Sequence, residues 1–202
     1  MYHAVDPKLV LFDYQKGRGR DGPRELLKNF SGYLQTDGYS VYDEFGKNKR
    51  ITLVGCMAHA HRYFDQALDN DPKRARHFLK EVQQLYLLEQ ALRDQQADWE
   101  KRQEVRQTLA VPILNGLKKW LDENYPDVPP KSPIGKAIKY SLQRWDKLCR
   151  YTTHGGLEID NNLVENQIRP LALGRKNYLF AGSHQGAQNA AIIYSLVGSC
   201  KL

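Results

Sequence analysis

The sequence has little cysteine, no long apolar run and no surplus of acidic residues, and each of these absences narrows the class of protein. Three cysteines occur, Cys56, Cys149 and Cys200, and their odd number and wide spacing fit reduced thiols better than a disulfide framework. No apolar run approaches the roughly 20 residues of a membrane helix, and the first residues lack the basic and apolar regions of a secretory signal. We therefore expect a cytoplasmic protein with no membrane partner.

The residues that are present are those of an ordinary globular protein with an excess of basic side chains. The hydrophobic fraction is 41%, the charged fraction is 26% and the net charge is +7, which favours a folded chain with a polyanionic partner. The cations gather in two clusters, which contain Lys16, Arg18 and Arg20 and then Arg169, Arg175 and Lys176. Such clusters suit contacts to phosphates, and a solvated basic face without a ligand is the alternative for each of them.

Short apolar segments near the start of the chain predict strands that alternate with helices. Residues 9–14, 33–37 and 51–56 are the strand segments, with a helix expected over 23–30 and a weaker helical segment over 39–45. The order strand, helix, strand, helix, strand predicts an α/β fold whose sheet contains parallel strands. Ligands of such sheets bind beyond the carboxyl ends of the strands.

The pattern changes to helix from Ala58 to about Tyr151. An apolar stripe at spacings of three and four predicts one amphipathic helix, and it consists of Phe78, Val82, Leu85, Leu88 and Leu92. A second helix is expected over about 111–124, and Ser132 with Pro133 form the cap and first turn of a third. The region is therefore expected to be a helical insertion in an α/β domain, after which a last helix follows within residues 184–199.

The stretch DNNLVENQIRP, residues 160–170, allows two interpretations. Asn162 and Glu165 have the spacing of a helix capping box, with Pro170 ending the helix. Alternatively, Glu165 is a metal ligand. Asp37 is equally ambiguous, because Asp37-Gly38 is a common turn after a strand, yet it also places a carboxylate at the carboxyl end of that strand. If the helical region folds as a separate unit, both acids can meet and, with a third, hold Mg²⁺ ions for attack on a phosphodiester.

The stretch CMAHAHRYF, residues 56–64, raises the alternative of a zinc site. Cys56 and His59 have the spacing of half a site, and Cys149 with His154 could supply the other half. Zinc half-sites are usually tight pairs, which makes this arrangement a poor match. The pattern favours a small buried Cys56 and a hydrogen-bonding His59 near the site. A cysteine–histidine nucleophile has no recognisable oxyanion-hole partner in the sequence.

Five motifs, in this order, resemble the insertion sequence 66 family of bacterial transposases: LVLFDY, GYLQTDGYSVYDEF, CMAHAHRYF, GLEIDNNLVENQIRPLALGRKNYLFAGS and AAIIYSLVGSCKL. The resemblance is to the DDE catalytic domain of ribonuclease H type. It implies a mixed sheet with an all-helical insertion, divided into residues 1–57, 58–153 and 154–202. It also implies that Asp37 and Glu165 are the second and third acids of the catalytic triad, both binding Mg²⁺ or Mn²⁺.

The resemblance implies a function in DNA transposition, in which the element's ends are cut and joined to target DNA. The two cation clusters, with Asn177, would contact DNA phosphates. The implied supporting residues near the site are His59, Arg62, Asp160, Asn161 and Asn162. Trp145 could stack on an unpaired base, although its helical spacing favours a place in the core.

The family's first catalytic aspartate belongs to a strand upstream of residues 9–14, and this sequence has no match for that strand. Asp6 and Asp13 are poor substitutes, since Asp6 precedes a proline and Asp13 lies within an expected strand near the sheet edge. The chain therefore resembles a transposase clipped at both ends and is expected to be inactive alone. The rival hypothesis is a non-catalytic DNA-binding or dimerising remnant that pairs with a full-length transposase.

Overall fold

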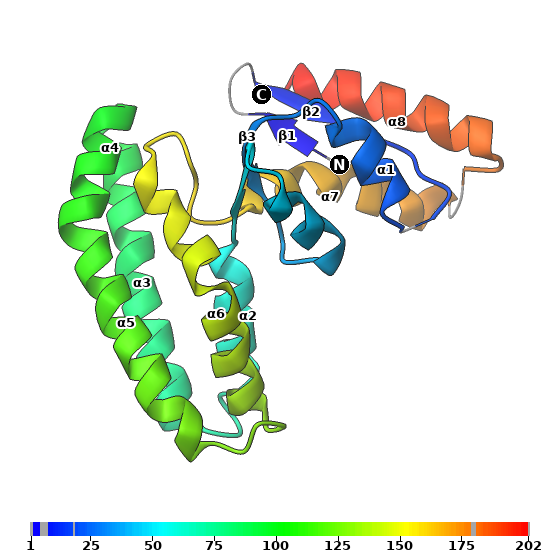
Figure 1. The fold of residues 1–202 in the computed structure, drawn as a ribbon. Coiled ribbons are helices and arrows are strands. Elements are labelled where there is room, and N and C mark those ends of the chain that lie inside the picture. Colours follow the sequence, from blue (N-terminus) through cyan, green and yellow to red (C-terminus); the bar gives the residue numbers. More distant parts are fainter. Residues whose placement is uncertain (1, 5–7, 18, 179–180, 202) are drawn as a thin grey trace. The chain divides into compact units, whose positions relative to one another are not determined.

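The structure is a computed structural model that describes residues 2–4, 8–17, 19–178 and 181–201 and divides into two compact units. Unit 1 combines the two ends of the chain, residues 1–29 and 161–202, and unit 2 is residues 30–160. The main hydrophobic core belongs to unit 2, between the helices drawn from cyan to yellow in Figure 1.

Unit 1 contains a small antiparallel sheet covered by a helix. Strands β1 (Tyr2–Ala4) and β2 (Leu9–Leu11) pair so that His3 lies opposite Val10, and α1 (Asp21–Leu27) follows them. The last helix, α8 (His184–Ser199), packs against β2. Because a strand of three residues is stabilised by few ladder bonds, this helix contact is what holds β2 in place.

Two serines of α8 bond to the backbone next to β2. Ser199 Oγ accepts from the Val10 amide at 3.1 Å, and Ser195 Oγ accepts from the Phe12 amide at 2.8 Å. A side chain added at Gly198 would lie 3.5 Å from Val10 Cβ, so the helix backbone lies close to the strand. Gly198 therefore allows this helix to pack closely against the strand.

The other long helix of unit 1 is α7 (Asn162–Tyr178), which contains Pro170. The prediction that Pro170 ends this helix is wrong. Proline's fixed φ is compatible with a helix, and the hydrogen bond that it removes is the one to the Asn166 carbonyl four residues earlier. Asn166 is exposed, so water can replace that bond.

Unit 2 begins with a parallel pair of strands. In β3 (Gly32–Gln35) and β4 (Ile51–Val54), Leu34 lies opposite Leu53, and the crossover between the strands is a 3₁₀ helix, η1 (Ser40–Lys47). Leu34, Leu53 and Val54 are buried, because strands of this kind are covered by helices. Both strands run in the same direction, so their carboxyl ends meet at one edge.

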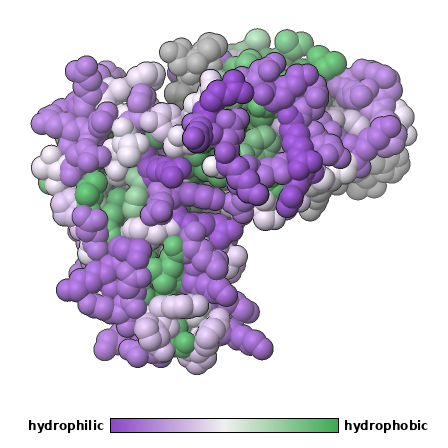
Figure 2. Space-filling view, viewed as in Figure 1, coloured by the Kyte–Doolittle hydropathy of each residue, from purple (hydrophilic) through white to green (hydrophobic). Residues whose placement is uncertain are grey.

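An all-helical region follows β4. Its elements are α2 (Met57–Asp65), α3 (Pro72–Asp94), α4 (Trp99–Val105), the π-helical turn η2 (Arg106–Ala110), α5 (Val111–Asn124), the 3₁₀ turn η3 (Tyr125–Asp127), α6 (Pro133–Cys149) and the 3₁₀ turn η4 (Arg150–Thr153). Side-chain caps begin three of these helices: the Asp71, Asp98 and Ser132 side chains accept hydrogen bonds from the amides of residues 74, 101 and 135. The polar faces of these helices cover most of the visible surface of this region (Figure 2).

The predicted apolar stripe of α3 faces the core of unit 2. Phe78, Val82 and Leu85 are fully buried, and the Phe78 ring stacks on the Phe64 ring with centroids 3.8 Å apart. Leucines of α5 and apolar residues of α6 complete this core. Burial of this apolar surface is the main source of stability of the helical region.

The core also contains an ion pair that joins distant parts of unit 2. Arg106 and Glu89 are both fully buried, and the guanidinium donates two hydrogen bonds of 2.7 Å to the carboxylate. Arg106 Nη1 also donates to the carbonyls of Tyr151 and His154 at 3.0 and 3.1 Å. The pair therefore fixes the segment after α6 to helix α3.

The sequence predicts most of these elements, and the structure adds corrections. The chain is mostly helical and contains short strands, which agrees with the predicted α/β class and helical region, whereas β1 was not predicted and residues 40–47 form a 3₁₀ helix. Within the described residues the strands form two separate two-stranded sheets, so a single mixed sheet of ribonuclease H type stays a prediction. No helix among the described residues has the length and apolar character needed to cross a membrane.

Candidate functional site

Asp37 follows the carboxyl end of β3, where the chain turns sharply. The Thr36 amide still bonds to the Val54 carbonyl at 3.0 Å, and then Asp37 Oδ1 accepts from the Tyr39 amide at 2.9 Å. Gly38 adopts a φ of +86°, a conformation that favours glycine. The Asp-Gly turn expected from the sequence is therefore present, and it leaves the Asp37 side chain exposed at the strand end.

Two side chains of α6 hold this turn. Arg144 Nη2 donates to the Gly38 carbonyl at 3.2 Å, and its guanidinium lies 4.5 Å from the centroid of the Tyr140 ring. A Cβ atom at Gly38 would lie 2.9 Å from the Tyr140 hydroxyl, so a larger residue would disturb the packing. Arg144 thus places a fixed positive charge beside the Asp37 turn.

Tyr140 is itself held by an aromatic neighbour. Its ring stacks on that of Tyr63 with centroids 4.4 Å apart. Burial raises the pKa of the Tyr140 phenol to about 12, against the opposing effect of the Arg144 charge. The hydroxyl therefore stays protonated at neutral pH, and it can donate a hydrogen bond beside the turn.

The segment before α7, which includes Glu158 and Asp160, is held by hydrogen bonds at the same strand edge. Gln35, the last residue of β3, donates from Nε2 to the carbonyls of Gly55 and Glu158 at 3.0 and 2.8 Å. Tyr86 of α3 donates to Asp160 Oδ2 at 2.8 Å. Burial, together with the Asp160 charge, raises the pKa of Tyr86, so its hydroxyl remains a donor. Asp160, one of the predicted supporting residues, is thus fixed within unit 2.

Glu165 lies in the first turn of α7, in unit 1. The helix begins at Asn162, and the Asn161 carbonyl accepts from the amides of Val164 and Glu165 at 2.9 and 3.1 Å. The helix therefore begins one residue earlier than a capping box of Asn162 and Glu165 requires, because Asn162 is already its first residue and not its cap. Asp37 belongs to unit 2, so its meeting with Glu165 stays a prediction.

The cations of α7 share a face with Glu165. Arg169 follows Glu165 by four residues and Lys176 follows Arg169 by seven, which are spacings of one helical face. Arg169 and Lys176 are exposed, as are Lys16 and Arg20 near the chain start. The side chains of Arg175 and Asn177, and all of Arg18, lie outside the described residues.

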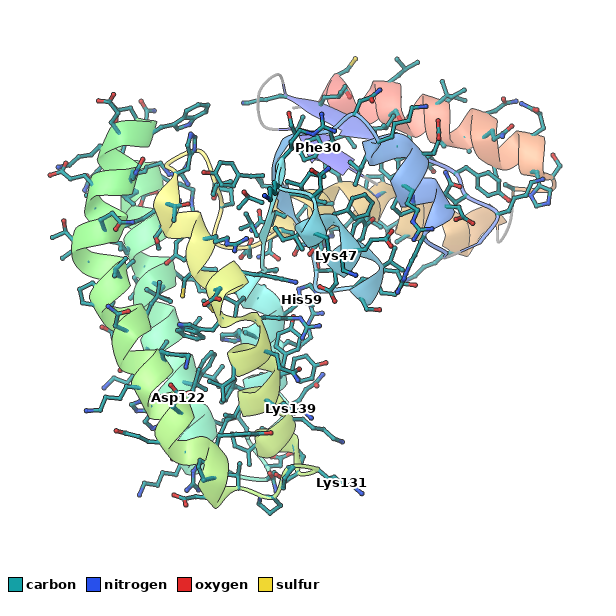
Figure 3. All side chains as sticks on the ribbon, in the orientation of Figure 1. Phe30, Lys47, His59, Asp122, Lys131 and Lys139 are labelled. Carbon is teal, nitrogen blue, oxygen red and sulfur yellow. The ribbon has the colours of Figure 1, made fainter. Side chains whose placement is uncertain are left out.

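The remaining predicted residues lie on helices of unit 2. His59 is half-buried on the first turn of α2 (Figure 3), and Arg62 is exposed one turn later. Trp145 packs in the core with 7% of its surface exposed, the position that its helical spacing favours. Its ring is therefore not presented for stacking on a base.

The alternative zinc site is not formed. Cys56 is buried with 1% exposed, as expected of a small core residue, and His154 Nδ1 accepts from the Gly156 amide at 3.0 Å. The part of the chain that the structure describes contains no group of three or more histidine, cysteine or acidic side chains that could hold a metal ion. Cys56, His59, Cys149 and His154 are all within that part.

Thiol labelling is expected to distinguish the three cysteines. Burial raises the pKa of the Cys149 thiol to about 12 and Cys56 is buried, whereas Cys200 is exposed. Because the thiolate is the reactive form, one thiol should react quickly with Ellman's reagent at pH 8 and two only after unfolding. A Cys200→Ser variant should lose the fast phase. Fast reaction of two thiols in the folded chain would contradict the assigned burial.

Sequence reasoning missed the residues that hold the Asp37 turn. On α6, Tyr140, Arg144 and Lys147 recur at spacings of four and three beside the apolar stripe, and Lys147 pairs with Asp43 of the crossover at 2.6 Å. This second periodic face was a signal that the helix packs against something polar. The Asp37 turn that this face contacts is more than 100 positions away in the sequence. The contact itself could therefore not be predicted from the sequence.

The fold and the candidate site define a mostly helical α/β protein. It has an acidic residue, Asp37, at a strand end, and α7 has cations on the same face as Glu165. Comparison with protein families identifies the family of this chain. The chain belongs to the IS66 family of transposases, because the family model described as "Transposase IS66 family" matches residues 1–189.

Relatives extend the match over the whole chain. The uncharacterized protein y4qI of Sinorhizobium fredii (strain NBRC 101917 / NGR234) is 35% identical over 209 residues, which cover 100% of this chain and 38% of that protein. The uncharacterized protein y4jD of the same strain is 33% identical over 204 residues, covering 97% of this chain and 39% of the relative. The chain thus spans about two fifths of the length of these relatives. No solved structure matches it.

Proposed function

We propose that this chain is part of the catalytic domain of a DDE transposase, which cleaves DNA at the ends of an insertion sequence and transfers the strands to target DNA. The observation that carries the proposal is the family match over residues 1–189, which includes both Asp37 and Glu165. Asp37 lies beyond the carboxyl end of a parallel strand, where α/β proteins place their ligands.

The order of elements supports a ribonuclease H-like fold with an insertion. An antiparallel pair, a helix, a parallel pair, a long all-helical region and then α7 follow one another along the chain. We propose the division into residues 1–57, 58–153 and 154–202 on this basis, with the helical part inserted between β4 and the catalytic helix.

The donor set fits a divalent metal ion. Asp37 is exposed, its Oδ1 is held by the Tyr39 amide, and its Oδ2 accepts no hydrogen bond from the described residues. We propose that Asp37 and Glu165 hold Mg²⁺ or Mn²⁺, which prefer carboxylate oxygens. When bound, such ions activate the attacking water or 3′ hydroxyl and stabilise the leaving oxygen. Arg144 keeps the Asp37 turn in place and adds positive charge next to it.

DNA is the partner that the charge distribution supports. Exposed Arg169 and Lys176 share the helix face of Glu165, so phosphates bound by these cations would lie along the same face as the catalytic carboxylate. Lys16, Arg20 and, by family resemblance, Arg18, Arg175 and Asn177 would extend this contact. Pairing with another transposase chain would bring two element ends together.

A second candidate function is a DNA-binding or dimerising remnant without catalysis. The ligand count favours it, because only Asp37 and Glu165 of the three acids are assigned in this chain. Two-metal catalysis needs both ions to be held, so two acids would leave one ion without a bridging carboxylate. Metal-dependent nicking separates the two functions, since a remnant binds DNA without cutting it.

Binding of duplex DNA is expected to weaken steeply as salt rises. With only three phosphate contacts, raising the salt from 50 to 200 mM would reduce the affinity by about 40-fold, because each contact releases about 0.9 counterion. Electrophoretic mobility shifts at several salt concentrations would measure this slope. Affinity that stays flat with salt, or no binding at micromolar protein, would contradict a role in nucleic-acid binding.

A further inference from the structure

One face of α3 carries a stripe of cations that belongs to neither cluster considered above. Lys73, Arg76, His77 and Lys80 recur at spacings of three and four and are exposed. The core residues of the same helix, such as Phe78 and Val82, lie on another face and are fully buried. We call Lys73, Arg76, His77 and Lys80 the α3 stripe.

The charge of Lys73, the first residue of the α3 stripe, opposes what helix stability favours. The first turn of α3 contains no acidic residue, although the positive end of a helix dipole favours acids and disfavours cations there. Asp71 caps the helix and pairs with Arg74 at 2.8 Å. Among the described residues no acidic side chain forms an ion pair with Lys73, Arg76 or Lys80. A concentration of cations that stability does not explain points to an anionic partner.

Two adjacent hollows flank the stripe, each of about 400 Å³. Arg76 and Lys80 line both hollows. His61 of α2 lines the first hollow, and Trp120 of α5 lines the second, with its ring centroid 4.6 Å from that of His77. The cations therefore line two open hollows on the surface of unit 2, which are accessible to an anion.

We propose that the α3 stripe is a second DNA-binding surface, which contacts the phosphate backbone of duplex DNA through Lys73, Arg76 and Lys80. Lysine and arginine at helical spacing meet successive phosphates without reading base sequence, so this contact adds affinity and orientation rather than specificity. The proposal rests on the proposed function, because DNA is the polyanion that a transposase handles. It assigns to the helical region of unit 2 a role in holding DNA.

The test compares two triple variants of the full chain. In the first, Lys73, Arg76 and Lys80 are each replaced by alanine; in the control, Lys131, Lys136 and Lys139 are replaced in the same way. All six residues are exposed and each variant loses the same number of positive charges. Lys131 lies in the turn before α6, and Lys139 lies on the helix (Figure 3). Alanine favours helix and no buried group is removed, so both variants should fold.

The α3 variant should bind duplex DNA at least about tenfold more weakly than the control variant at 150 mM salt. Its salt slope should fall by about 2.7, because each lost phosphate contact removes about 0.9 from the slope. Equal affinities and slopes in the two variants would overturn this inference and leave DNA binding by the chain intact. Absence of binding by the unaltered chain would instead overturn the proposed function.

A measurement on the unaltered chain tests the same surface without depending on the folding of either variant. Lysine acetylation followed by mass spectrometry should show Lys73 and Lys80 protected when duplex DNA is bound, with Lys131 and Lys139 unchanged. Equal reactivity of Lys73 and Lys80 with and without bound DNA would contradict the α3 stripe as a DNA-binding surface.

Discussion

An Arg106→Met variant is expected to lose about 3–5 kcal/mol of unfolding free energy, a large part of the stability of a domain of this size. Arg106 and Glu89 are fully buried, and the substitution leaves the Glu89 carboxylate in the core. The cation that still pairs with the Glu89 carboxylate is Arg102, whose Nη2 lies 3.5 Å from Glu89 Oε2. The variant also loses the hydrogen bonds to the carbonyls of Tyr151 and His154. Urea unfolding followed by circular dichroism would measure the change in midpoint and slope.

Two further variants isolate the cause. A Glu89→Gln/Arg106→Met double variant should recover part of the loss, because it no longer buries an unpaired charge. As a control, Lys118→Met removes the cation of an exposed ion pair with Asp122. It should change the free energy of unfolding by less than about 0.5 kcal/mol. A single variant as stable as the unaltered chain would show that the pair is not buried in solution.

Substitution of the proposed metal ligands is expected to have the largest effect on function. In a version extended upstream by a family member's first acidic strand, Asp37→Asn or Glu165→Gln should reduce metal-dependent nicking at least about 10³-fold, or about 4 kcal/mol of barrier. Asparagine keeps the side-chain oxygen that accepts from the Tyr39 amide, so the turn should persist while the charge is lost. The chain of 202 residues alone should not nick the DNA.

A matched substitution controls for loss of any acid. Glu123→Gln removes the same charge from an exposed pair with Lys119, and it should leave nicking unchanged. DNA binding should survive in all these variants, since the proposed phosphate contacts are cations. Full activity of Glu165→Gln would contradict a role of Glu165 in metal binding and leave it a structural role in α7. Robust nicking by the unextended chain would show that it contains more metal ligands than Asp37 and Glu165.

Local patterns predicted the helices well, because their signals lie within a few residues of one another. Ser132 before Pro133 predicted the start of α6, and the Ser132 hydroxyl does accept from the Gly135 amide at 3.1 Å. The helix expected over about 111–124 is α5, with the same bounds. Pro170 misled the prediction of α7, because a proline costs a helix one hydrogen bond without preventing its continuation.

The parts that could not be predicted depend on contacts between distant residues. Arginine and glutamate are seldom fully buried, and nothing in the sequence near Arg106 indicates that its partner is Glu89 on another helix. Gln35 likewise reads as an ordinary strand residue, although it joins β3 to the Glu158 carbonyl. Asp37 could be singled out from its place before Gly38, whereas Arg144, which holds its turn, could not.

The central claim is that Asp37 and Glu165 share a metal site, and the most direct test is a crystal structure of the protein with Mn²⁺ and element-end DNA. The anomalous signal of manganese would locate the ion independently of the positions assigned to the protein atoms. We expect a peak within about 2.5 Å of a carboxylate oxygen of both residues, as for oxygen ligands of divalent ions. Carboxylates of Asp37 and Glu165 that are both well ordered and lie more than about 10 Å apart would contradict the claim.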